Sequence, residues 1–192
     1  HSIPEPHGLS QWSKNSLKEL AALKLGYELR ISLDSYLQDL EYVSGQKAKL
    51  DKELEKLLRK DEHKEVATYL RSVPGVGLVV ASAFRLELFA PDRFGRAEEV
   101  SSFTGLAPMV RHSGEGKVKG WLMPVGQKFL RSVLVQAAWR WISKDKGARA
   151  QYERLRSNTG LVQKAIVGMA RKLATILWRL SVERRSYTPY SI

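Results

Sequence analysis

The longest uninterrupted helical pattern in this chain lies in its first part. Between Ser10 and Leu70 there is no proline, and Gly26 and Gly45 are the only glycines. Residues of one series recur there at alternating steps of four and three: Tyr36, Leu40, Val43, Lys47, Leu50, Leu54 and Leu57. This heptad spacing over about three heptads predicts one or two long helices with a coiled-coil seam, in which Lys47 would set the register. A helix packed on its own domain would show the same spacing, so that alternative stays open.

Helical signals return further along the chain, between breaks made by proline and glycine. Pro74–Gly77 ends the first pattern, an apolar segment runs from Leu78 to Phe89, and a short helix from Glu98 to Phe103 should stop at Gly105. Two later stretches have helical periodicity: Leu130, Leu134, Ala137, Ala138 and Trp141, then Val162, Ala165, Ile166, Met169, Leu173, Ile176, Leu177 and Leu180. Such spacing is typical of core-facing helices, so we expect a mainly α fold.

The expected organisation is a helical coiled-coil segment, residues 1–70, followed by a compact basic helical domain, residues 71–192. The compact domain should contain a helix-hairpin-helix motif and a glycine-rich loop. The loop, residues 107–126, is expected to form at most a small hairpin that pairs residues near Val110 with residues near Val118.

The charge of the chain is concentrated in its second part. Residues 1–70 carry 11 Lys/Arg and 12 Asp/Glu, whereas residues 71–192 carry 21 and 8. A field of this size attracts polyanions, and nucleic acid is the usual polyanion for such a protein. A surface selected only for solubility is the alternative.

The turn that holds Gly75 and Gly77 suggests how nucleic acid would be held. A helix ends, a glycine-bearing turn follows, and a second helix begins, as in a helix-hairpin-helix motif. Glycines at these positions leave the backbone open to close approach, and the free amides that start the second helix can donate to a phosphate oxygen. Such a contact grips the backbone without reading sequence. An ordinary turn between two helices is the alternative.

A second candidate site lies in the glycine-rich loop. If residues 111–113 are extended, Arg111 and Ser113 point to one side and His112 to the other. A hydroxyl beside a guanidinium is suited to attack on a phosphodiester, with the arginine stabilising the developing charge. The same geometry argues against His112 as the base for Ser113. A serine before a glycine is also a common turn residue, which is the structural alternative.

Other kinds of chemistry are disfavoured by composition. The chain has no cysteine, which excludes disulfides, thiolate zinc sites and cysteine nucleophiles and favours an intracellular setting. The acidic residues of the basic part and the four histidines have no ligand spacing, so we expect no metal site in this chain. No apolar stretch approaches the ~20 residues needed to cross a bilayer. The chain begins with His1 without a signal-peptide pattern, and we expect it to be an internal piece of a longer protein.

Residues from about 66 to 187 resemble the C-terminal transposase domain of one bacterial and archaeal insertion-sequence family, insertion sequence family one-ten. The transposases of this family are described as bridge-RNA-guided recombinases. The matching residues, in chain order, are Val73-Pro74-Gly75-Val76-Gly77, Phe94, Gly105-Leu106-Ala107-Pro108, Ser113-Gly114, Gly126, Leu130-Arg131, Ala137-Ala138, Tyr152, Ala165 with Ala170, Lys172-Leu173, and Tyr187. Each piece is weak alone, and the ordered set is specific.

The resemblance implies an acidic, RNase-H-like N-terminal domain that would precede His1, then a coiled coil, then the transposase domain. It implies that Ser113 is the nucleophile and forms a covalent phosphoserine with a cut DNA end. Mg²⁺ would be bound by the N-terminal domain and no cofactor by this chain, which alone should be inactive. The expected partners are DNA, a guide RNA and a second copy of the chain through the coiled coil, with no membrane, in the cytoplasm of a prokaryotic cell.

The leading interpretation is therefore the C-terminal part of a transposase that cuts and joins DNA. Arg111 would support catalysis by Ser113, and the expected nucleic-acid contacts are Gly75, Gly77, Lys117, Lys119, Lys128 and Arg131. A non-enzymatic helix-hairpin-helix nucleic-acid-binding module with a coiled-coil assembly segment is the alternative. A purely structural coiled-coil protein would leave the uneven charge unexplained.

Overall fold

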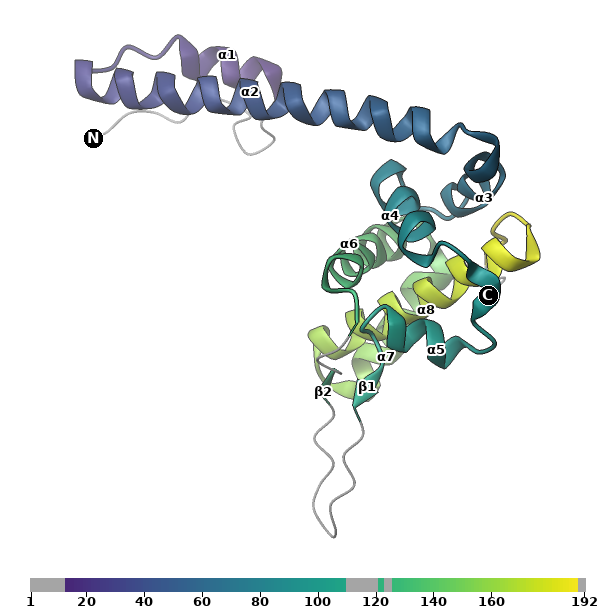
Figure 1. The fold of residues 1–192 in the computed structure, drawn as a ribbon. Coiled ribbons are helices and arrows are strands. Elements are labelled where there is room, and N and C mark those ends of the chain that lie inside the picture. Colours follow the sequence, from purple (N-terminus) through teal and green to yellow (C-terminus); the bar gives the residue numbers. More distant parts are fainter. Residues whose placement is uncertain (1–12, 110–120, 123–125, 190–192) are drawn as a thin grey trace. The chain divides into compact units, whose positions relative to one another are not determined.

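The computed structural model describes residues 13–109, 121–122 and 126–189 (Figure 1). In these ranges the chain is mainly helical, as the periodicity predicts. The helices are α1 (Lys14–Ala21), α2 (Tyr27–Leu58), α3 (Asp61–Arg71), α4 (Leu78–Leu88), the 3-10 turn η2 (Pro91–Arg93), α5 (Ala97–Phe103), α6 (Lys128–Lys144), α7 (Lys146–Thr159) and α8 (Val162–Glu183). Two short strands, β1 (Pro108–Met109) and β2 (Trp121–Leu122), lie between α5 and α6.

The chain divides into two compact units, His1–Lys52 and Glu53–Ile192, and the division falls within α2. In the first unit, Ser13 caps α1, since its Oγ accepts a hydrogen bond from the Ser16 amide at 3.2 Å. Arg30 joins α2 to the turn after α1: its Nη1 donates to the carbonyl oxygens of Ala21 at 3.0 Å and Leu23 at 3.2 Å. The domain boundary that the charge suggests, between residues 70 and 71, stays a prediction.

The predicted seam lies along α2, and much of it is exposed. The side chains of Tyr36, Val43 and Leu50 are 73%, 61% and 63% exposed. Lys47, the charged member of the series, pairs with Asp51 one turn further on, with Nζ 2.6 Å from Oδ2. The coiled coil itself stays a prediction, and this apolar row is available for it.

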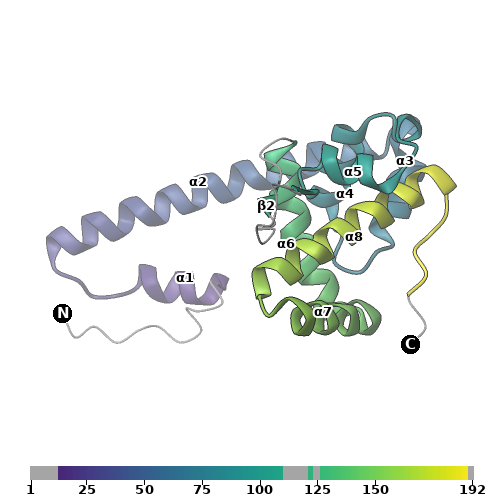
Figure 2. The same cartoon turned by 90° about the horizontal axis from the view of Figure 1, so that it is seen from below.

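The second unit is built around α8, which packs against α3, α5, η2, α6 and α7. Figure 2 shows α8 running across the unit between α5 and α7. Six of the eight predicted core positions on α8 are buried: Ala165, Ile166, Met169, Leu173, Leu177 and Leu180. Val162, in the first turn, is 38% exposed and Ile176 is half-buried. Those on α6 are buried as well, and Trp141 and Leu134 are fully covered. The 3.6-residue period therefore identified both helices and their buried faces correctly.

The shorter elements also agree with the local signals. α4 begins directly after Gly77, and α5 ends at Phe103, two residues before Gly105 with its φ of +67°. The described strands are antiparallel, with Pro108 opposite Leu122 and Met109 opposite Trp121. Val110 and Val118, near which a hairpin was expected, lie outside the described residues. No helix in the described part of the chain is both long enough and apolar enough to cross a bilayer.

Candidate nucleic-acid interface

The strands β1 and β2 bracket the segment that carries the predicted nucleophile. Residues 110–120 run between the strands and hold Arg111, Ser113, Lys117 and Lys119. These four candidates lie outside the described residues, so the structure defines the two ends of their segment and not their side chains.

Two glycines, Gly105 before β1 and Gly126 after β2, are in close contact at the base of this strand pair. Gly126 has a φ of +103°, and a Cβ built on it would come within 2.5 Å of the Gly105 backbone nitrogen. A side chain at position 126 would therefore collide with backbone that cannot move aside. The Gln127 amide also donates to the Phe103 carbonyl oxygen at 3.1 Å. Residues 103–105, at the end of α5, and residues 126–127, just before α6, are thus in direct contact.

Arg131, a predicted phosphate ligand, takes part in this base. It lies one turn into α6 and is half-buried, and its Nη1 donates to the Gly105 carbonyl oxygen at 3.2 Å. Lys128, the first residue of α6, is exposed and forms no ion pair among the described residues. Lys128 is therefore free to meet a phosphate, whereas Arg131 has a structural partner. Its phosphate contact stays a prediction.

The turn between α3 and α4 shows that its two candidate glycines differ. A Cβ on Gly75, whose φ is +92°, would lie 2.7 Å from the Trp141 backbone nitrogen, so the close approach that Gly75 permits is to α6. Gly77 has no atom within 4 Å of such a Cβ and adopts an extended conformation as the N-cap of α4. Only Gly77 therefore leaves open space where a ligand could approach the start of α4.

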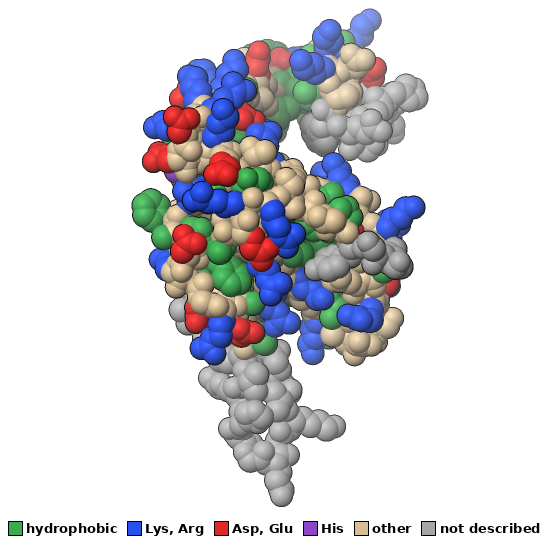
Figure 3. All heavy atoms as spheres, turned by 90° about the vertical axis from the view of Figure 1, so that its right-hand side faces the viewer, with side chains coloured by type: hydrophobic (Ala, Val, Ile, Leu, Met, Phe, Trp, Pro, Cys, Tyr) green, Lys and Arg blue, Asp and Glu red, His purple; other side chains and the backbone are tan. Residues whose placement is uncertain are grey.

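Basic side chains accumulate on the last three helices. Residues 126–189 contain 14 Lys/Arg and only three acids, Asp145, Glu153 and Glu183. Figure 3 shows one face on which Lys and Arg side chains gather, with acidic side chains between them. Arg171, Lys172 and Arg179 of α8 lie outside the apolar series of that helix, and none of them was among the predicted site residues. They line one pocket. Arg171 and Lys172 lie about two helical turns before Arg179, and this spacing was the available signal.

Among the residues that the structure describes, no group of three or more His, Asp or Glu side chains comes together to hold a metal ion. Asp145, one of the few acids here, has a different role. Its Oδ1 caps α7 by accepting the Ala148 amide at 2.8 Å.

Comparison with known proteins shows that part of this helical domain is similar to transposases. Residues 67–153, from α3 into α7, match the family described as "Transposase IS116/IS110/IS902 family". The chain therefore contains a transposase domain of the IS110/IS116/IS902 family and has homologues among transposases.

The relatives come from several bacteria. The chain is 32% identical over 170 residues to a putative transposase, y4pF/y4sB, of Sinorhizobium fredii, an alignment that covers 81% of this chain and 43% of the relative. It is 26% identical over 153 residues to an uncharacterized protein of insertion element IS110 from Streptomyces coelicolor, with 79% and 37% covered. It is 26% identical over 121 residues to the transposase of IS1111A from Coxiella burnetii, with 62% and 33% covered. The chain thus spans about two fifths of the length of the first two relatives.

Proposed function

We propose that this chain is the part of a DNA transposase that cuts and joins DNA through the hydroxyl of Ser113. The observation that carries the proposal is the antiparallel pairing of β1 and β2 in the part of the chain that resembles transposases: the described residues on either side of 110–120 lie next to each other. A nucleophile must be held close to its ideal position, and paired strands on both sides of its segment serve that need.

In the proposed step, the Ser113 oxygen attacks a phosphorus atom of the DNA backbone. The new bond joins serine to phosphorus, and the bond from phosphorus to the leaving DNA oxygen breaks. Arg111 stabilises the charge that develops on the phosphate oxygens. The phosphoserine keeps the DNA end activated, so that a hydroxyl of another strand can attack it and release Ser113.

Further parts of the proposal come from the family resemblance. Mg²⁺ is bound by an acidic domain outside this chain, and a guide RNA selects the DNA. A second copy of the chain associates along the exposed row on α2 that includes Tyr36, Val43 and Leu50. Lys117, Lys119 and Lys128 neutralise phosphates near the cut.

The decisive experiment uses Ser113→Ala in the full-length transposase with labelled DNA. We expect this variant to form no covalent protein–DNA adduct and to cut no strand, while its DNA affinity and melting temperature stay near those of the wild type. Ser132→Ala is the matched control, because Ser132 is an exposed serine of α6 without a side-chain hydrogen bond in the described structure. Adduct formation by Ser113→Ala at the wild-type level would show that another group is the nucleophile.

The open end of α4 supports a second candidate function, a non-enzymatic nucleic-acid-binding module. No side chain caps the start of α4, and a Cβ built on its N-cap, Gly77, would meet no atom within 4 Å in the described structure. A helix-hairpin-helix contact needs such an open helix start. A module of this kind would bind DNA and never form a covalent adduct, so the adduct assay separates the two functions.

A further inference from the structure

A groove lies between α5 and α8 beside the strand pair. It encloses about 710 Å³ and is lined by Ala97, Glu98, Ser101, Ser102, Ala107, Pro108, Arg171, Lys172, Thr175, Ile176 and Arg179. A second hollow of about 590 Å³ shares Ala97, Glu98 and Arg179 with it and continues past Trp178. Pro108 belongs to β1, so one end of the groove is at the strand that leads into residues 110–120.

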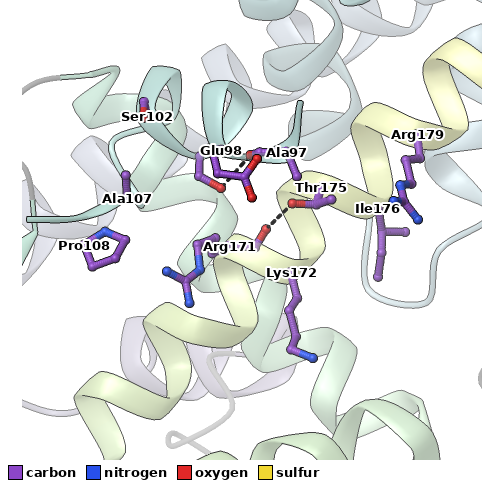
Figure 4. Close-up of a pocket in the computed structure, with 11 residues that line it drawn as sticks. Ala97, Glu98, Ser102, Ala107, Pro108, Arg171, Lys172, Thr175, Ile176 and Arg179 are labelled. Atoms are coloured by element: carbon purple, nitrogen blue, oxygen red, sulfur yellow. Dashed lines mark hydrogen bonds between the residues drawn. The ribbon is translucent and has the colours of Figure 1, made fainter. Parts of the chain in front are cut away.

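The larger hollow contains three cations and one carboxylate. Arg171, Lys172 and Arg179 of α8 line the hollow together with Glu98 of α5, and none of the three cations is within ion-pair distance of an acid in the described part of the chain. Figure 4 shows Thr175 between Arg171 and Arg179 along α8, with Glu98 on the neighbouring helix α5. The two arginines are eight residues apart on α8, which separates them by about 12 Å along the helix axis.

Lys172 shows that positive charge is crowded at this place. It is half-buried, and its Nζ donates to Gln151 Oε1 at 3.0 Å. Burial lowers the pKa of Lys172, and the nearby charges of Arg154 and Arg171 lower it further. An anion in the groove would relieve this repulsion, which no carboxylate of the described structure relieves by pairing.

We infer that the groove between α5 and α8 binds the sugar-phosphate backbone of a DNA strand, with Arg171 and Arg179 contacting different phosphates. A span of about 12 Å suits a polymer, because the charges of one strand recur about every 3.4 Å along a duplex. The two connected hollows are also too extended for one small anion. The choice of DNA rests on the proposed function, since the groove adjoins the strand that leads to Ser113.

Glu98 has an opposing role in this site. It is exposed at the start of α5 and stands among the cations, so it repels a phosphate that enters the groove. Its neutralisation should therefore strengthen binding, whereas neutralisation of either arginine should weaken binding. If these side chains were merely structural, their neutralisation would not change DNA affinity in opposite directions.

The test measures binding of the 192-residue chain to a labelled DNA strand of fixed length over a series of salt concentrations. We expect Arg171→Gln combined with Arg179→Gln to bind roughly tenfold more weakly at low salt. The slope of log affinity against log salt should fall by about 0.7 to 0.9 for each arginine. Two unrelated sequences should be affected equally, because phosphate contacts carry no sequence information.

Arg59→Gln is the matched control, and Glu98→Gln is the variant with the opposite expected effect. Arg59 is an exposed arginine just after α2 that lines neither hollow, and its loss should leave the slope unchanged within error. Glu98→Gln should bind DNA several-fold more tightly and, at an exposed position, should keep the fold even if the double variant does not. Thermal unfolding of each variant identifies any loss of structure.

The outcomes separate this inference from the proposed function. An unchanged salt slope in the double variant, or an unchanged affinity in Glu98→Gln, would show that this groove does not bind DNA. A loss confined to an RNA strand of the same length would overturn the choice of DNA. The Ser113 adduct assay does not depend on these residues, so adduct formation together with unaffected groove variants would reject the groove alone.

Discussion

The hydroxyl of Tyr187 donates a hydrogen bond to Oδ2 of the buried carboxylate of Asp145, at 2.9 Å. The same hydroxyl accepts from Nε1 of Trp141 at 3.3 Å, and the Tyr187 amide donates to Oγ of Ser72 at 2.8 Å. The segment after α8 therefore joins the α3–α4 turn to the corner between α6 and α7. Because Asp145 also caps α7, both of its oxygens have partners, as a buried carboxylate requires.

Tyr187→Phe should lower the free energy of unfolding by about 1 to 3 kcal/mol, since it leaves a buried carboxylate oxygen without its donor. Urea denaturation measures the change. Tyr69→Phe is the matched control, because the Tyr69 hydroxyl bonds to Glu65 in an exposed pair and its loss should cost less than about 0.5 kcal/mol. Equal effects of the two substitutions would contradict the role assigned to Asp145.

Gly75→Ala should destabilise the fold by roughly 3 kcal/mol, because its Cβ would strike the Trp141 backbone at a positive φ. Gly77→Ala should cost no more than about 1 kcal/mol, since its φ of −99° suits any residue and its surroundings are open. Thermal unfolding of both variants tests the contrast. A larger loss at Gly77 would mean that the turn is built differently.

Gly77→Glu should keep the helical circular-dichroism spectrum and weaken nucleic-acid binding at low salt. The new carboxylate would stand in the open space at the start of α4, where a phosphate is proposed to approach. Gly77→Gln is the control for size without charge and should bind more tightly than Gly77→Glu. Wild-type affinity in the glutamate variant would assign this turn a structural role only.

Gly126→Ala should loosen the base of the strand pair, because its Cβ would lie 2.5 Å from the Gly105 nitrogen. We expect a loss of at least tenfold in strand cleavage by the full-length protein. Gly160→Ala also places an alanine at a positive φ, +66°, but its Cβ would meet no atom within 4 Å. That control should cost about 1 to 2 kcal/mol of stability and leave cleavage nearly unchanged.

Arg154→Gln should raise the pKa of Lys172, since Arg154 is one of the two cations that lower it below its ordinary value of 10.5. Between the lowered folded pKa and the unfolded value, the unfolded chain binds more protons than the folded one. The contribution of Lys172 to the free energy of unfolding therefore increases with pH in that window. In the variant the two pKa values should lie closer together, so this increase should be smaller. NMR titration of the lysine side-chain carbons measures the pKa. An unchanged value would remove Arg154 as a cause.

Much of the helical architecture was predictable because burial on one face of a helix leaves a local period in the sequence. The spacing identified five buried residues of α6, from Leu130 to Trp141, and six of α8, from Ala165 to Leu180. The expectation of one or two helices before Leu70 was less accurate, since the chain there forms α1, α2 and α3. Short breaks such as Arg59–Lys60 carry no proline or glycine, so composition alone did not mark them.

The candidate site was predictable only in part. The turn with Gly75 and Gly77 stood out as a local motif, yet the packing of Gly75 on Trp141 depends on a residue 66 positions away. Arg131 was chosen for its charge, and only the fold shows that it donates to Gly105. The groove was missed because its acid and its cations come from two helices that are far apart in sequence.

The amino-acid sequence by itself determined the mainly α fold, the faces of α6 and α8 and the concentration of positive charge, because each depends on residue type and near-neighbour spacing. Only the tertiary structure decided which distant groups meet: Tyr187 with Asp145, Gly126 with Gly105, and Arg171 and Arg179 with Glu98 in one groove. Those meetings depend on how whole helices pack. Helix packing is set by the shapes of many side chains together, and no short stretch of sequence contains that information.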